Sequence, residues 1–232
     1  MATPVPKKSW FARDQLSTIP IPQGNGYWQP IPHLDYAQTV IETLKLRGIR
    51  VDAERYALSE EGAKMFGVLE TSCSAQGARF LVGIQNAHDK SLGIKMFMGC
   101  TTGACENLIF FREVRERANK HCNNFSLQDF LSVGLDEFQR ALPMLEQNIV
   151  RAKETHLDQD AAKLFIYRLF VAEDTNLPHH LIYVVHREYF EAEDNVYSPG
   201  NEWALRNAFA NALFKLNPIQ HFKTALTLSR FF

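Results

Sequence analysis

The sequence predicts an α+β protein, in which a mostly antiparallel meander of about five strands is followed by a helical C-terminal half. Two observations carry this prediction. Between residues 49 and 111, apolar and polar side chains alternate in short runs that are joined by short turns. From residue 126 onward, the apolar side chains instead recur every three or four positions, which is the spacing of one helix face.

Five runs make up the predicted sheet, and they cover residues 49–58, 64–71, 80–86, 93–100 and 108–111. In the third run Phe80, Val82 and Ile84 point to one side, and the fourth run repeats the alternation. The connections between runs are short, which favours antiparallel neighbours, because parallel strands need long crossover connections. A helix over residues 34–47 is expected to precede the sheet.

The helical half is predicted from its capping residues. Ser126 and Asp129 form a capping box before a long amphipathic pattern, in which Pro143 is expected to produce a kink. Further helices are expected to begin near Asp158, Pro178, Ser198-Pro199 and Asn217-Pro218.

Residues 1–33 are expected to form an extended arm, because they hold six of the ten prolines. The arm carries four aromatic side chains, Trp10, Phe11, Tyr27 and Trp28. These rings either strap the arm over its own domain or anchor it on a neighbouring subunit or partner. Residues 34–232 are expected to form a single α+β domain, sheet-rich over 34–125 and helical over 126–232, since no linker composition separates the two parts.

Composition excludes several classes of protein. The net charge of −1 at pH 7 excludes a uniformly basic nucleic-acid coat, although segregated charge can still form a local basic patch. No run approaches the ~20 apolar residues that span a bilayer. A secretory signal would have an apolar run after its basic residues, and no such run follows Lys7 and Lys8. The four cysteines are too few for a disulfide scaffold, so we expect free thiols and a reducing cytoplasm. Because no apolar run is long enough to span a bilayer, we also expect no membrane partner.

Four stretches, at residues 82–91, 105–108, 119–121 and 203–208, carry a distinctive set of polar and aromatic residues. The set is Asn86, His88, Asp89, Lys90, Ser91, Cys105, Asn107, His121, Trp203 and Asn207. In this order, these positions resemble the phage- and plasmid-encoded proteins catalogued as domain of unknown function 932. Ala87 stands where that family usually has serine, and Phe209 begins a stretch where it usually has a threonine–glutamate pair. The resemblance implies a protein of a mobile element in the cytoplasm of a bacterial host cell, and it implies no activity.

The polar turn from Asn86 to Ser91 has two interpretations. Asn and Asp side chains bond to the local backbone, so the turn can serve only to connect two strands. Alternatively it presents a binding site, because Lys90 offers a point charge and Ser91 a hydroxyl, both suited to phosphate.

A basic rim is predicted beside this turn. Successive turns of a meander alternate between the two ends of the sheet, so the last strand runs back toward the end that carries Lys90. Its exit is rich in arginine and lysine. The predicted nucleic-acid-binding residues are therefore Lys90, Ser91, Arg112, Arg115, Arg117 and Lys120. The alternative is a solvated helix of mixed charge.

His88, Asp89 and Cys105 are the candidate catalytic residues if the protein is an enzyme. A metal site would recruit the same residues together with His121. The meander, however, places His88 and Cys105 at opposite ends of a strand about 23 Å long, which is the length of seven residues in β conformation. We therefore expect no metal site and no cofactor. His33 has no companion in the sequence that would give it a role.

Together these observations predict a non-catalytic accessory protein of a phage or plasmid. It is expected to engage nucleic acid, with single-stranded DNA as the partner, in recombination or in evasion of host defence. One alternative is a nucleotide-directed hydrolase or transferase that uses His88 and Asp89. Another is an inhibitor that binds a host protein through the aromatic arm. The arm and an exposed sheet edge also favour a homo-oligomer.

Overall fold

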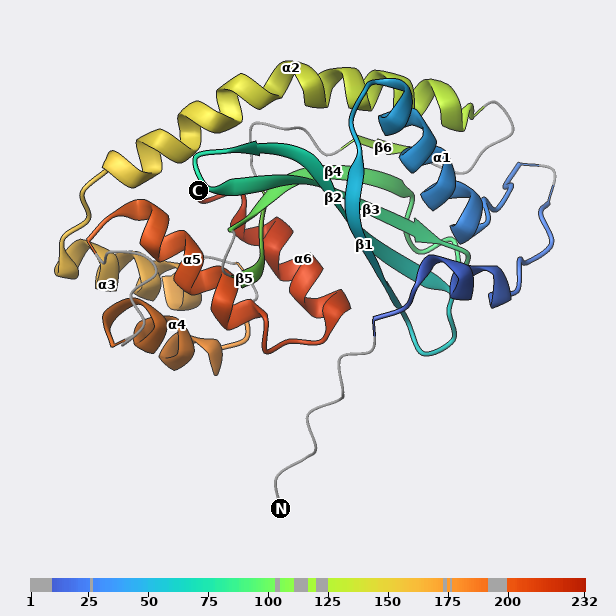
Figure 1. Cartoon of the computed structure of the whole chain (residues 1–232). Helices are drawn as coiled ribbons and strands as arrows, with labels where there is room; N and C mark the ends of the chain where they lie inside the picture. Colours follow the sequence, from blue (N-terminus) through green and yellow to red (C-terminus); the bar gives the residue numbers. More distant parts are fainter. Residues whose placement is uncertain are drawn as a thin grey trace. The chain divides into compact units, whose positions relative to one another are not determined.

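The structure is a computed structural model that describes residues 10–25, 27–102, 105–110, 117–119, 125–172, 175, 177–191 and 200–232. It is α+β, as predicted, with the strands preceding most of the helices (Figure 1). The chain divides into two compact units. The first holds the described residues within 1–74, 79–99 and 113–141, and the second holds those within 75–78, 100–112 and 142–232.

The sheet follows the chain order, with strands β1 (Val51–Leu58), β2 (Lys64–Ala75), β3 (Ala78–Ala87), β4 (Ile94–Thr102) and β5 (Cys105–Phe110) side by side. A further strand, β6 (Arg117–Asn119), pairs antiparallel with the first residues of β4. The antiparallel meander consists of β1 to β4, so the predicted count of about five was wrong. The reason is length: β5 has six residues and β6 three, so each covers only part of a nine-residue neighbour, β4.

Close packing within the sheet depends on Gly67. It pairs with Tyr56 on the adjacent strand β1. A methyl group at position 67 would lie 2.7 Å from Cγ1 of Ile84 and 2.9 Å from the Tyr56 ring, so the glycine lets that ring lie across the strand. The Tyr56 hydroxyl donates a hydrogen bond to Glu54 over 2.7 Å.

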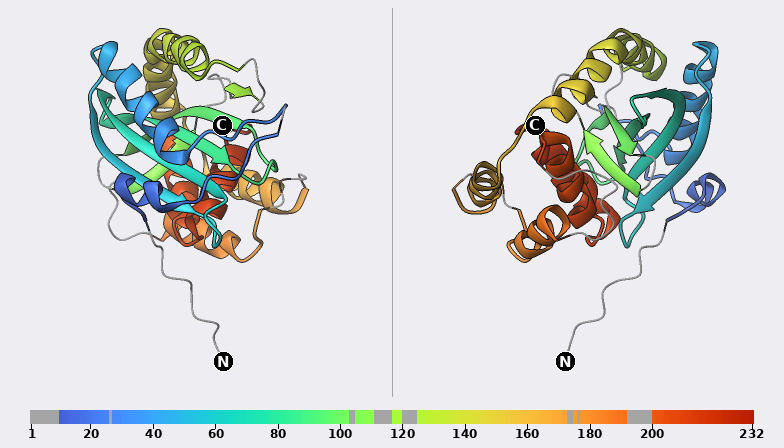
Figure 2. Two further views of the ribbon diagram at one scale, coloured as in Figure 1. Left: turned by 90° about the vertical axis from the view of Figure 1, so that its right-hand side faces the viewer. Right: turned by 60° about the vertical axis from the view of Figure 1, so that its left-hand side comes forward.

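Helix α1 (His33–Leu46) agrees with the predicted helix over 34–47. It buries Tyr36, Ala37, Val40 and Leu44, and the Tyr36 hydroxyl donates a hydrogen bond to the Lys95 carbonyl over 2.7 Å. Both views in Figure 2 show α1 running along the strands of the first unit. The arm is not extended throughout, because residues Arg13–Thr18 form a short 3-10 helix, η1.

The remaining helices are α2 (Leu127–Glu154), α3 (Gln159–Tyr167), η2 (Arg168–Ala172, a π-helical turn), α4 (Leu181–Phe190), α5 (Glu202–Leu213) and α6 (Pro218–Leu228). The caps predicted at Asp158 and Asn217 are confirmed, since both side chains accept a backbone hydrogen bond. The start of α5 was predicted at Ser198-Pro199, which lie outside the described residues. The helix begins at Glu202 and is capped by Asn201, through a 2.8 Å bond from the Ala204 amide. In the second unit α5 contacts α4, α6 and β5 (Figure 2).

The described helices include none that is both long enough and apolar enough to cross a membrane.

Candidate functional site

The polar turn that follows β3 is tied to the arm by two histidines. The rings of His33 and His88 are stacked, with centroids 3.9 Å apart and an interplanar angle of 3°. His88 bonds through Nε2 to the Ile31 carbonyl over 2.9 Å, and His33 bonds through Nε2 to the Gly62 carbonyl over 2.9 Å. We call this group, completed by Asn86, the histidine clasp. It fastens the end of the arm to the strand ends of the first unit.

Asn86 fixes the protonation pattern of the clasp. Its Nδ2 lies 2.7 Å from the Ile31 carbonyl, which can only accept, and 3.0 Å from Nδ1 of His33. Nδ1 of His33 therefore accepts a hydrogen bond, so its Nε2 carries the proton that is donated to Gly62. Two buried acceptors, Oδ1 of Asn86 and Nδ1 of His88, have no hydrogen-bond partner among the described residues. The buried part of the turn thus follows the structural interpretation, in which polar side chains bond to the nearby backbone.

The exposed part of the turn is ordered by Asp89. Its carboxylate accepts hydrogen bonds from the amide and the hydroxyl of Ser91, and it pairs with Lys64 across 3.3 Å. Burial raises the pKa of Asp89, but the hydrogen bonds from Ser91 and the ammonium of Lys64 outweigh it, so the pKa lies below its ordinary value. The Ser91 hydroxyl, predicted to meet phosphate, is therefore engaged with Asp89.

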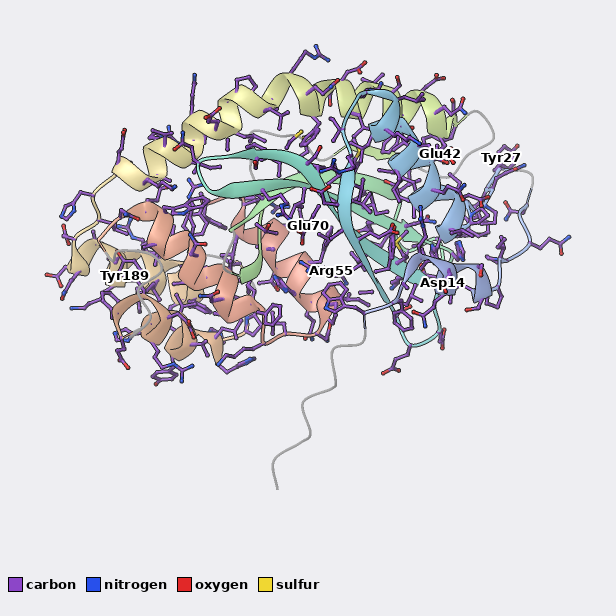
Figure 3. The ribbon with its side chains drawn as sticks, in the orientation of Figure 1. Asp14, Tyr27, Glu42, Arg55, Glu70 and Tyr189 are labelled. Atoms are coloured by element: carbon purple, nitrogen blue, oxygen red, sulfur yellow. The ribbon has the colours of Figure 1, made fainter. Side chains whose placement is uncertain are left out.

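Lys90 extends from the same turn over an aromatic ring of the arm. Its backbone is left-handed, with φ of 61°, and its ammonium lies 4.8 Å from the centroid of Trp28. Trp28 closes a tight turn with Asn25, through backbone bonds of 3.0 and 2.9 Å. Tyr27 lies at the tip of this turn and is 89% exposed (Figure 3). We call Tyr27, Trp28 and Lys90 the aromatic–lysine knuckle.

The other described aromatic residues of the arm pack on the sheet of the same chain. The guanidinium of Arg55 lies 5.2 Å from the centroid of the Trp10 ring, and Phe11 forms backbone bonds of 2.8 and 3.1 Å with Tyr56. Arg55 also pairs with Glu70 on the neighbouring strand, across 3.6 Å (Figure 3). These rings are engaged within the first unit, whereas Tyr27 is open to solvent.

Most of the predicted basic rim cannot be placed. Arg112, Arg115 and Lys120 lie outside the described residues, as does His121. Arg117 opens β6 opposite Met96, while Cys105 and Asn107 lie on β5. The described members of the predicted rim are therefore Lys90, Ser91 and Arg117. Strand β4 separates His88 from Cys105 along the chain.

Trp203 and Asn207 lie on α5 in the second unit and are buried there. Nδ2 of Asn207 donates a hydrogen bond to the Trp203 carbonyl over 2.7 Å, and the Lys153 ammonium lies 5.9 Å from the Trp203 ring centroid. Oδ1 of Asn207 is buried, with no hydrogen-bond partner in the part of the chain that the structure describes. Both residues contribute to packing of the helix rather than to an exposed site.

No cluster of three potential metal ligands occurs among the residues that can be described. Cys73 and Cys100 are free thiols, and burial raises the pKa of the Cys100 thiol well above its ordinary value. Cys100 is therefore a protonated core residue at neutral pH and not a nucleophile.

His33 is the residue that sequence reasoning missed. Its partners Asn86 and His88 are 53 and 55 positions away, and nothing in their spacing announces the pair. The only available signal was the arm itself, whose prolines place Ile31 and His33 where the arm meets the first helix.

Comparison of the chain with protein-family models, with curated proteins and with solved structures found no match.

Proposed function

We propose that this chain binds single-stranded nucleic acid, without catalysing a reaction, and that the aromatic–lysine knuckle is the contact surface. The proposal is supported by the ammonium of Lys90, which lies 4.8 Å from the Trp28 ring centroid, and by Tyr27, the residue before Trp28, which is 89% exposed. The setting in a phage or plasmid, in recombination or evasion of host defence, rests on the resemblance carried by residues 86–91.

The chemistry of the knuckle suits a single strand. An exposed tyrosine ring can stack on any base, and such stacking contributes about 1–3 kcal/mol per base. The Lys90 ammonium, which lies over the ring of the neighbouring Trp28, can meet a phosphate of the same strand. Because Lys90 rests on Trp28, less side-chain entropy is lost when it binds. One local cation also fits a chain whose net charge is −1.

Two observations favour binding over catalysis at this turn. His88 is 7% exposed and its Nε2 is committed to the Ile31 carbonyl, so it has no open path to a substrate. Asp89 faces Ser91 and Lys64. A host-protein partner is less favoured, because Trp10 and Phe11 already pack against residues of β1.

The test is a titration of a fluorescein-labelled oligo(dT) strand with the full chain, followed by anisotropy at low and high salt. We expect Tyr27→Ala to weaken binding about tenfold, which is the loss of about 1.4 kcal/mol of stacking. Lys90→Asn, which tolerates the left-handed backbone, should weaken binding and lower its salt dependence.

The matched controls are Tyr183→Ala and Lys45→Ala, which remove an exposed tyrosine and an exposed lysine from helices that carry no residue of the knuckle. Equal losses in the knuckle and control variants would contradict the proposal, and so would failure of the wild-type chain to bind the strand at low salt. Capture of a host protein that depends on Tyr27, without any binding of the strand, would favour the inhibitor alternative.

A further inference from the structure

The end of the chain is basic and has no acidic residue. Residues 203–232 contain Arg206, Lys215, Lys223 and Arg230, with no aspartate or glutamate. Arg206 is buried and pairs with Glu202, whereas Lys215, Lys223 and Arg230 are exposed. The near-neutral total charge therefore conceals a segregated cluster in the second unit.

Several cations of the described chain are paired with carboxylates, whereas the three in this acid-free segment are not. Ion pairs with carboxylates are formed by Arg13, Arg50, Lys64, Arg79, Lys163 and Arg187. Among the residues that the structure describes, Lys215, Lys223 and Arg230 form no ion pair. Their charges are thus available to an external anion.

Helix α6 carries Lys223, and the turns before and after the helix carry Lys215 and Arg230. His221, Phe222, Ala225 and Leu228 are buried and define the inner face of the helix. Gln220, Lys223 and Thr227 recur at intervals of three and four, which places them on the opposite face. Arg230 lies in the turn that follows the end of the helix at Leu228. Lys215 lies in the turn before the helix.

We propose that Lys215, Lys223 and Arg230, named here the α6 basic stripe, contact the phosphate backbone of single-stranded nucleic acid. The inference rests on the proposed function and extends it to the second unit. Phosphate contacts carry affinity and little sequence information, so the stripe supplies general affinity while the knuckle stacks a base.

The composition of α6 favours a soluble polyanion over a lipid surface. A helix that lies in a membrane interface needs an apolar face directed outward. The apolar face of α6 is buried, and its exposed positions, Gln220 and Lys223, are polar or charged. Phe214, which is 37% exposed, lies before the helix, beside Lys215. Polar groups at this spacing can bind phosphates in water but cannot insert among acyl chains.

The experiment compares two triple variants of the full chain in the oligo(dT) titration at several salt concentrations. The first is Lys215→Gln, Lys223→Gln and Arg230→Gln. The control triple is Arg50→Gln, Lys163→Gln and Arg187→Gln, which removes the same charge from cations that already pair with carboxylates. For single strands each lost phosphate contact lowers the slope of log K against log salt by about 0.7. We expect the first triple to lower the slope by about 2 and the control triple to leave it near the wild-type value.

The outcomes separate this inference from the proposed function. Equal slopes for the two triples, or weakening in the knuckle variants alone, would overturn the stripe. A lower slope in the first triple with unchanged knuckle variants would support the stripe and contradict the knuckle. Absence of any wild-type binding would overturn both. If the first triple variant lost binding to anionic phosphatidylserine vesicles but kept its oligo(dT) binding, the result would contradict the proposed nucleic-acid contact and favour a membrane surface.

Discussion

His33 and His88 lie face to face, with ring centroids 3.9 Å apart and planes within 3° of parallel. One ring belongs to the first residue of α1 and the other to the turn after β3, so the stack joins segments that are far apart in sequence. Each ring also bonds to a carbonyl, of Gly62 and Ile31 respectively. The neutral form of His33 satisfies this arrangement, because a protonated Nδ1 would face the amide hydrogens of Asn86.

The clasp predicts different costs for its two histidines. His33→Phe retains an aromatic ring for the stack but removes the partner of the Gly62 carbonyl and an acceptor of Asn86, so we expect a loss of about 1–3 kcal/mol in the free energy of unfolding. His88→Phe removes one bond to Ile31, whose carbonyl keeps the bond from Asn86, and should cost about 1 kcal/mol or less. Urea unfolding of both variants measures the difference. A larger loss in His88→Phe than in His33→Phe would contradict the hydrogen-bond assignment.

Two buried tyrosines predict a loss of stability in alkali. Burial raises the pKa of Tyr36, and burial together with the Glu54 carboxylate raises that of Tyr56. Both hydroxyls stay protonated in the fold while the unfolded chain ionises near pH 10, so their contribution is complete below pH ~10 and is lost as the pH rises further. Each tyrosine lowers the free energy of unfolding by up to about 1.4 kcal/mol per pH unit in this range.

The measurement is the free energy of unfolding at pH 9 and pH 11. The double variant Tyr36→Phe and Tyr56→Phe is expected to lose less stability between these values than the wild-type chain. The matched control is Tyr27→Phe with Tyr183→Phe at exposed positions, where the loss should equal that of the wild type. An identical pH dependence in the buried and exposed double variants would rule out this account.

The sequence was informative where local chemistry decides structure. The period of the apolar residues predicted α1 within one residue at each end, and capping chemistry located the starts of α3 and α6 at Asp158 and Asn217. The start of α5 was predicted too early, because serine and asparagine are similarly favourable N-cap residues and the sequence offers Ser198 as well as Asn201, which caps the helix.

Contacts between residues far apart in the chain could not be predicted from the sequence. The polar turn was recognised, but its division into a buried half with Asn86 and His88 and an exposed half with Lys90 depends on where the arm lies. That path is set by contacts such as His33 with Gly62, which no periodicity encodes. The α6 basic stripe was visible in the sequence as an acid-free segment, yet only burial of Arg206 separates the available cations from the structural one.

The buried cation, Arg206, predicts that removing its partner alone destabilises the fold more than removing both members of the pair. Arg206 is 3% exposed, bonds to Glu202 through Nε and NH2, and donates to the Phe232 carbonyl over 2.7 Å. Glu202→Ala leaves a buried guanidinium without its carboxylate. We expect this variant to lose about 2–4 kcal/mol in the free energy of unfolding, somewhat below the usual cost because a quarter of the Glu202 side chain reaches solvent.

The double variant Glu202→Ala with Arg206→Met should be more stable than Glu202→Ala alone, because a methionine fills the site and leaves no buried charge. Both variants lose the same favourable carboxylate in the first turn of α5, so that effect cancels in the comparison. Denaturant unfolding measures both, with Asp160→Ala as the control for an exposed pair, expected to cost no more than about 1 kcal/mol. A double variant less stable than Glu202→Ala would show that the hydrogen bond and ring contact of Arg206 with Phe232 outweigh the cost of its unpaired charge.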